Sequence, residues 1–140
     1  MAIRSTLGGF SADLDAFSKQ LGVGLDTTVR KVAIDIHDGV ILKTPRDTGR
    51  AAVSWNIQAG TPDNSVEPPR SDNSGAANAT GEAQAKQSRI VPGDGMGAIY
   101  ITNSLPYIER LEFGYSKQSP QGMVRVTLSE VEAEIRAAQR

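Results

Sequence analysis

The segment Asp47-Thr48-Gly49 matches the short active-site signature of aspartic proteases. Those enzymes use two carboxylates that share one proton, so a chain with one copy of the signature would have to act as a homodimer. A catalytic aspartate of that kind also lies in an apolar strand, whereas Thr44-Pro45-Arg46 precedes Asp47 and Arg50 follows the signature. Asp-Thr-Gly is also common turn chemistry, and three residues often match by chance. We therefore interpret Asp47, Thr48, Gly49 and Arg50 as a structural turn, with a homodimeric aspartic protease acting through Asp47 as the alternative.

No other residues form a recognisable catalytic or ligand-binding set. His37 is the only histidine, and the chain has no cysteine, so a histidine or thiolate metal site cannot be completed. We expect His37 to be a partly exposed helix residue. No serine lies in a Gly-x-Ser-x-Gly pattern, and the glycines at 93, 95 and 97 lead into a strand instead of a phosphate-binding helix. The sequence predicts no enzyme, no cofactor and no metal.

Length, charge and composition favour one soluble domain. A chain of 140 residues can bury its own core without a disulfide or metal. The 15 basic and 16 acidic residues are interspersed, which gives a net charge of −1 and no basic stripe for duplex binding. No apolar run approaches the roughly 18 residues of a membrane span. We expect a protein made in the cytoplasm, with no membrane contact.

The aliphatic spacing predicts one long helix in the first third of the chain. Residues of its main apolar face recur at helical spacing: Val29, Val32, Ala33, Ile36 and Val40. Pro45 ends the helix, because the residue before a proline disfavours helical backbone. Ile34 and Ile41 form a second apolar stripe, so we expect this helix to contact both its own core and another surface. Glycines at positions 22 and 24 interrupt an earlier helical pattern.

The rest of the chain predicts two strands, a long loop and two helices. Alternating apolar residues indicate a half-buried strand over 51–58 and a second strand over 98–103. Residues 61–95 contain few large apolar side chains, so we expect a flexible loop that becomes ordered on assembly, with at most one helical turn at 83–86. Helices are expected over 105–112 and 123–140. The predicted class is α+β in a single domain, 1–140: a long N-terminal helix, a small antiparallel sheet with a long flexible loop, and C-terminal helices.

Two segments together carry a family resemblance. The first is Thr44-Pro45-Arg46-Asp47-Thr48-Gly49-Arg50, which continues into Ser54-Trp55-Asn56. The second runs from residue 99 to 124 and contains Asn103, Pro106-Tyr107, Leu111-Glu112, Gly114 and Gly122-Met123. In order and spacing they resemble the minor tail, tail-completion or neck proteins of long-tailed bacteriophages. Ile108 stands where that family usually has alanine.

The resemblance implies a structural protein of the virion, made in the host cytoplasm and without enzymatic activity. It implies a closed ring at the head–tail junction, with six copies favoured over twelve, that joins the tail to the capsid connector and lines the DNA path. Its expected partners are further copies of itself, neighbouring neck, tail-terminator or tail-tube proteins, and passing DNA in transient, non-specific contact. Residue patterns alone would also fit a monomeric protein-binding adaptor.

A ring of identical subunits needs two different surfaces on each subunit, because only heterologous contacts with a closing rotation form a ring. We expect Ile34 and Ile41 to form the first surface. The second surface is expected in segment 106–115, with these aromatic and polar contact residues: Tyr107, Glu109, Arg110, Glu112 and Tyr115. The alternative is that these side chains pack the subunit's own core. Lys117 and Arg125 are expected to face the DNA path.

Overall fold

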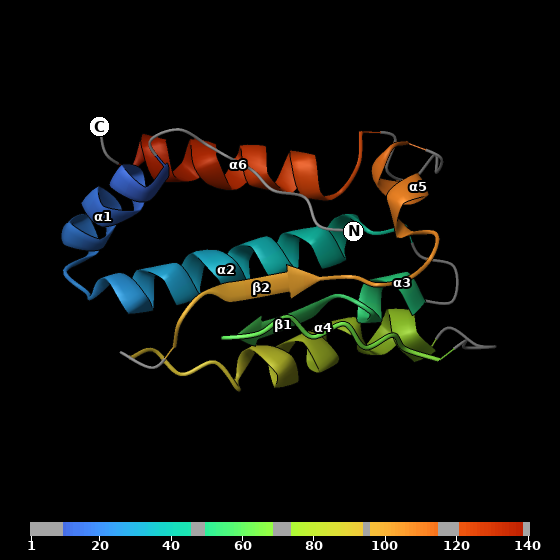
Figure 1. Cartoon of the computed structure of the whole chain (residues 1–140). Coiled ribbons are helices and arrows are strands. Elements are labelled where there is room, and N and C mark those ends of the chain that lie inside the picture. The colour runs from blue at the N-terminus through green and yellow to red at the C-terminus, as the bar shows by residue number, and fades with distance from the viewer. Residues whose placement is uncertain (1–9, 46–49, 69–73, 94–95, 115–120, 139–140) are drawn as a thin grey trace.

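The computed structural model describes residues 10–45, 50–68, 74–93, 96–114 and 121–138 (Figure 1). In these residues the order of elements is α1 (Phe10–Leu21), α2 (Leu25–Lys43), α3 (Arg50–Val53), β1 (Asn56–Ala59), α4 (Ser74–Gln87), β2 (Ile99–Thr102), α5 (Ile108–Glu112) and α6 (Val124–Ala137). The fold is α+β, as the sequence predicts.

The first two helices meet at a glycine corner. Gly22 has φ +70°, a left-handed conformation that lets its amide bond back to the Ser18 carbonyl at 3.1 Å and end α1. The long helix α2 begins at Leu25 and ends at Lys43, with Thr44 as its C-cap, so the predicted helix end is confirmed. Pro45 follows directly and cannot continue the helix.

The two strands form an antiparallel pair in which Ile57 lies opposite Ile101. The predicted second strand is confirmed, but the first begins five residues later than expected, because residues 50–53 form the short helix α3. Residues 51–57 are all buried. The alternation of apolar and polar residues therefore does not mark an inner and an outer face in this segment.

Helix α4 corrects the prediction of an irregular loop over 61–95. Residues 74–87 are helical, and Ala79 and Ala83 are 2% and 4% exposed within the largest core cluster. Alanine is a strong helix former, and its small side chain lets α4 approach α3 closely. The composition indicated a loop because the segment has few large apolar side chains. Two helices that pack closely through alanine do not need such side chains. Ordering of this segment on assembly stays a prediction.

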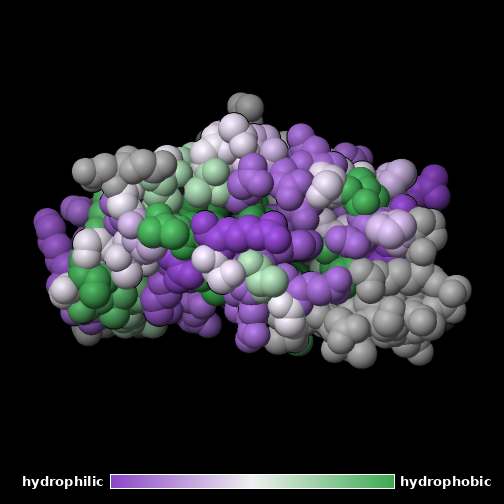
Figure 2. Space-filling model, turned by 90° about the horizontal axis from the view of Figure 1, so that it is seen from below, coloured by the Kyte–Doolittle hydropathy of each residue, from purple (hydrophilic) through white to green (hydrophobic). Residues whose placement is uncertain are grey.

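Helix α2 runs through the middle of the molecule, with α1 and α6 on one side and the sheet and α4 on the other (Figure 1). Val32 of α2 packs with Val131 and Ile135 of α6, and Ala33 packs with Ile57 of β1. The core therefore lies on both sides of α2. Seen from below, the surface is mostly hydrophilic in its middle, and apolar side chains gather mainly toward the left-hand end (Figure 2).

Candidate functional site

Buried polar side chains connect the segments that carry the family resemblance. Trp55 Nε1 donates a hydrogen bond to Thr44 Oγ1 at 2.8 Å, and the Thr44 hydroxyl donates to the Val40 carbonyl at 2.6 Å. Both side chains are buried, at 3% exposure each. Trp55 is therefore a core residue, and its indole nitrogen ties the segment before β1 to the end of α2.

Asn103 makes the second connection. It is 2% exposed, and its Nδ2 donates to the Ala51 carbonyl of α3 at 3.0 Å. Its Oδ1 accepts from the Leu105 amide at 3.2 Å. A single buried amide thus fixes the chain leaving β2 against α3 and turns it toward α5, which explains why a side chain with both a donor and an acceptor occupies this position.

Glu112 makes the third and most polar connection. Its side chain is fully buried, and Oε2 accepts hydrogen bonds from the backbone amides of Met123 and Val124 at 2.8 and 2.9 Å. Its Oε1 accepts from the Arg125 amide and from Arg125 Nε, both at 3.1 Å. A carboxylate from α5 therefore caps the N-terminus of α6, where free N–H groups and the helix dipole favour negative charge.

Burial alone would raise the pKa of the Glu112 carboxyl, because a charged group loses its hydration. The three backbone N–H groups and Arg125 stabilise the ionised form more strongly, so the pKa of Glu112 lies below its ordinary value. Glu112 is thus a buried carboxylate that remains charged at neutral pH.

Gly122 is required for this arrangement. It has φ +90°, and an added Cβ would lie 2.5 Å from the Glu112 carbonyl oxygen and 2.6 Å from Glu112 Oε1. No side chain fits at those distances, so only glycine lets the chain pass close enough to be capped. Met123, which follows, is fully buried. The Leu-Glu and Gly-Met parts of the family pattern are therefore two halves of one packing unit.

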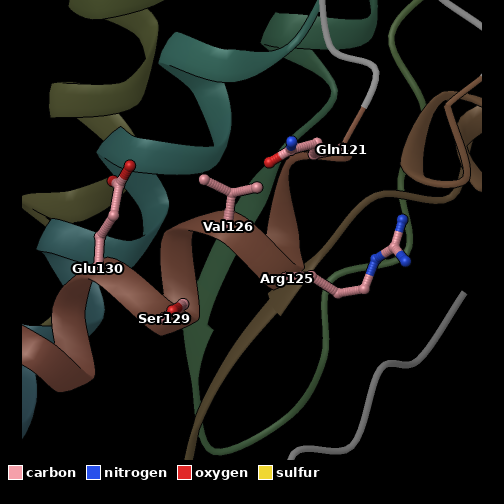
Figure 3. A pocket seen from close by; sticks show the side chains of 5 residues that line it. All are labelled: Gln121, Arg125, Val126, Ser129 and Glu130. Atoms are coloured by element: carbon pink, nitrogen blue, oxygen red, sulfur yellow. The ribbon is translucent and has the colours of Figure 1, made fainter.

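Arg125, expected on the DNA path, is held by that unit. Its guanidinium also donates to the Glu112 backbone carbonyl and lies 5.0 Å from the centre of the Phe113 ring. Its side chain is 52% exposed. Figure 3 shows it extending away from Val126 and Glu130, with which it lines a shallow depression beside α6.

That depression carries no recognisable chemistry. Its lining comprises Gln121, Arg125, Val126, Ser129 and Glu130. The Glu130 carboxylate lies 2.8 Å from Lys43 Nζ, and no histidine lies beside Ser129 to act as a base. Among the described residues, no three His, Asp or Glu side chains gather in a way that could hold a metal ion.

The structure corrects two of the expected interface residues. Ile41 is 5% exposed and packs in the subunit's own core, and Glu112 caps α6 instead of facing outward. Ile34 is half-buried and packs against the cluster around Ile57. The second stripe of α2 is apolar because the sheet and α4 cover the side opposite α6, so both stripes serve the internal core.

The remaining expected site residues are exposed, belong to α3, or lie outside the described residues. Tyr107 is 37% exposed, and Glu109 and Arg110 are exposed, so all three are accessible. Arg50 is the first residue of α3, not part of a turn, and its Nε donates to the Glu67 carbonyl at 2.9 Å. The others lie outside the described residues: Asp47, Thr48, Gly49, Tyr115 and Lys117.

His37 is fully buried, which corrects the expectation of a partly exposed residue. Its Nε2 lies 3.0 Å from the Trp55 carbonyl, and its Nδ1 lies 2.9 Å from Gln87 Nε2, which also donates to Asp38 Oδ1 at 2.7 Å. A carbonyl only accepts, so Nε2 carries the proton and Nδ1 accepts from Gln87. Burial is the main cause that lowers the pKa of His37, and the nearby Lys86 ammonium adds to it. The imidazole is therefore neutral and structural.

Exposed apolar side chains lie at both ends of α2, and none of them was predicted as a site residue. Leu21, Val23 and Leu25 are 43%, 42% and 46% exposed at the corner between α1 and α2. At the other end of α2, Phe113 is 62% exposed after α5, and Leu42 is 76% exposed. The signal was present in the alternation Leu-Gly-Val-Gly-Leu over 21–25, because a glycine corner leaves its neighbours little to pack against.

No helix in the described part of the chain is long and apolar enough to cross a membrane. The chain matches no protein-family model, and no curated protein or solved structure is significantly similar to it.

Proposed function

We propose that this protein is a non-enzymatic structural subunit of the neck or tail-completion ring of a long-tailed bacteriophage. One observation supports the proposal above others: the residues that carry the sequence resemblance are joined to one another in space. Thr44 bonds Trp55, Asn103 bonds the Ala51 carbonyl, and Glu112 caps the helix that follows Gly122. Short motifs that match by chance have no reason to interlock.

The interlocked residues hold segments of the backbone together. They fix the end of α2, the chain after β2 and the start of α6, and each uses its polar atoms on backbone groups or on one another. Such a set defines a rigid frame whose outer surfaces are free to contact neighbouring subunits. In this reading the ring joins the tail to the capsid connector and surrounds the DNA path.

The proposal is tested by mixing the purified full chain with tail tubes assembled from the tube protein of the same genome. Electron microscopy is expected to show a closed ring added at one end of the tubes, and the mass of the protein alone is expected to exceed that of a monomer. Gln84→Ala, an exposed change on α4, is the control variant and should form rings as the parent chain does. A chain that stays monomeric and leaves the tubes undecorated would instead support the adaptor alternative.

A further inference from the structure

We propose that neighbouring subunits join head to tail, with the corner surface of one copy packed against the aromatic end of the next. The corner surface is Leu21, Val23 and Leu25, and the aromatic end is Tyr107 and Phe113. This inference deepens the proposed function and rests on it, because it states which surfaces close the ring. It replaces Ile34 and Ile41, which pack internally, with residues that are exposed.

The corner surface is held rigid by local hydrogen bonds. Ser18 is 5% exposed, its hydroxyl donates to the Val23 carbonyl at 2.8 Å, and its own carbonyl accepts from the Gly22 and Val23 amides at 3.1 and 3.3 Å. The three aliphatic side chains therefore project from a fixed turn between two helices. A preorganised apolar surface loses little conformational entropy on binding, which favours a specific contact.

The aromatic end is also preorganised. Phe113 lies against the Arg125 guanidinium at 5.0 Å, and Arg125 is fixed in turn by the buried Glu112 carboxylate at 3.1 Å. Tyr107 lies at the start of the same short helix. Aromatic and arginine side chains are enriched among the residues that contribute most to protein interfaces. The end of the molecule thus has the composition of a contact surface.

The two surfaces lie at opposite ends of the molecule (Figure 1). The corner precedes α2, and α5 lies near the other end of α2, whose 19 residues span about 28 Å at 1.5 Å per residue. A copy that presents its corner surface to one neighbour therefore has its aromatic end available for a second neighbour. Two different surfaces at opposite ends are what a heterologous, head-to-tail contact uses, and such contacts form a ring when the rotation between copies closes.

The charges around the surfaces favour a second copy as the occupant. Among the described residues near the corner, Asp15 and Asp26 outnumber Lys19. The aromatic end presents the exposed guanidinium groups of Arg110 and Arg125, and the Arg125 charge is balanced by the buried Glu112 carboxylate. Exposed carboxylates at one end can therefore meet exposed guanidinium groups at the other, which favours contact between unlike ends. The acidic balance at the corner also disfavours an anionic lipid surface, which recruits lysine and arginine.

The test uses three single substitutions in the full chain. Leu25→Asp removes an aliphatic group from the corner and places a carboxylate at the start of α2, where the helix dipole tolerates it. Phe113→Ser removes the ring from the aromatic end. Val91→Ser is the matched control, because Val91 is 72% exposed and belongs to neither surface. Thermal unfolding followed by circular dichroism checks that each variant folds.

Mass is then measured by light scattering over a range of concentrations. We expect Leu25→Asp and Phe113→Ser each to raise the concentration at which half the chains assemble by at least about tenfold, whereas Val91→Ser assembles as the parent does. An equimolar mixture of the two deficient variants retains one intact pair of surfaces. It should give a heterodimer of twice the 14.9 kDa chain mass and nothing larger.

Three results would overturn the inference. Folded Leu25→Asp and Phe113→Ser chains that still form rings would show that other surfaces make the contact, and the proposed ring function would stand. Variants that are monomeric but do not pair on mixing would show that the two surfaces are not partners. A parent chain that is monomeric at every concentration and ignores tail tubes would remove the proposed function together with the interface.

Discussion

Helices α4 and α6 are both attached to the rest of the molecule through a buried titratable side chain, but the two attachments differ in charge. The α6 attachment uses Glu112, a carboxylate that accepts three backbone N–H bonds. The α4 attachment uses His37, a neutral imidazole whose Nδ1 accepts from Gln87. One depends on a buried charge being present, and the other depends on a charge being absent.

The two helices also differ in what supports them besides that group. Helix α6 buries Val131 and Ile135 against α2, so an apolar stripe supports its polar cap. Helix α4 buries Ala79 and Ala83, which offer much less apolar area. Polar contacts therefore carry more of the attachment of α4, and its amides should open at lower cost than those of α6.

The largest effect is expected from Glu112→Ala. The substitution leaves three amides at the start of α6 without their acceptor, and each buried amide left unsatisfied costs about 1–3 kcal/mol. The Arg125 guanidinium also loses its partner, but it is half-exposed and water can solvate it. Denaturant unfolding measures the loss. Glu109→Ala, on the exposed side of the same helix, should change the free energy of unfolding by less than about 0.5 kcal/mol. Equal losses for the two variants would show that the cap is not a principal support of α6.

Gln87→Ala should have a smaller and local effect. It removes the donor to His37 Nδ1 and leaves a buried acceptor unsatisfied, at a cost of about 1–3 kcal/mol. Hydrogen exchange should show faster exchange of α4 amides, with α6 amides changed only as far as global stability changes. The matched variant Gln84→Ala alters an exposed residue of the same helix and should leave exchange unchanged. Uniform acceleration across the chain would contradict separate attachments.

How much of this comparison the sequence predicts depends on how each element is built. Helix α2 and strand β2 follow from local patterns. A long aliphatic repeat ended by Pro45 predicts a helix, and the alternating pair Ile99 and Ile101 predicts a strand. Helix α4 does not, because its support comes from His37 and Lys86, which are distant in the sequence or read as ordinary surface residues. The motif residues were found as a resemblance, but the role of Glu112 as a cap depends on α5 and α6 meeting in space.

Acid should release the two attachments in order. The pKa of His37 is lowered in the folded state, so its stabilising effect is complete above the ordinary value of 6.5 and declines as pH falls below it. The pKa of Glu112 is lowered from 4.5, so its contribution is complete above 4.5 and is lost only in stronger acid. One proton bound on unfolding gives a slope of at most about 1.4 kcal/mol per pH unit. Exchange measured at decreasing pH should show α4 opening before α6, and the reverse order would break the comparison.

Lys86→Met is expected to have the smallest effect and tests how His37 is kept neutral. Lys86 Nζ donates to the Val53 and Trp55 carbonyls at 2.7 and 3.2 Å, so the change should cost about 1 kcal/mol at neutral pH.

The Lys86→Met substitution also removes a positive charge that lowers the pKa of His37, while Asp38, which raises that pKa, remains. The pKa of His37 should therefore rise toward 6.5, and the loss of stability in mild acid should become shallower than in the parent chain. Burial is the larger cause of the lowered pKa, so some of the slope must persist. Nuclear magnetic resonance titration of the single histidine measures the shift directly. A pKa that falls on removal of Lys86 would show that the ammonium does not act on His37 through its charge.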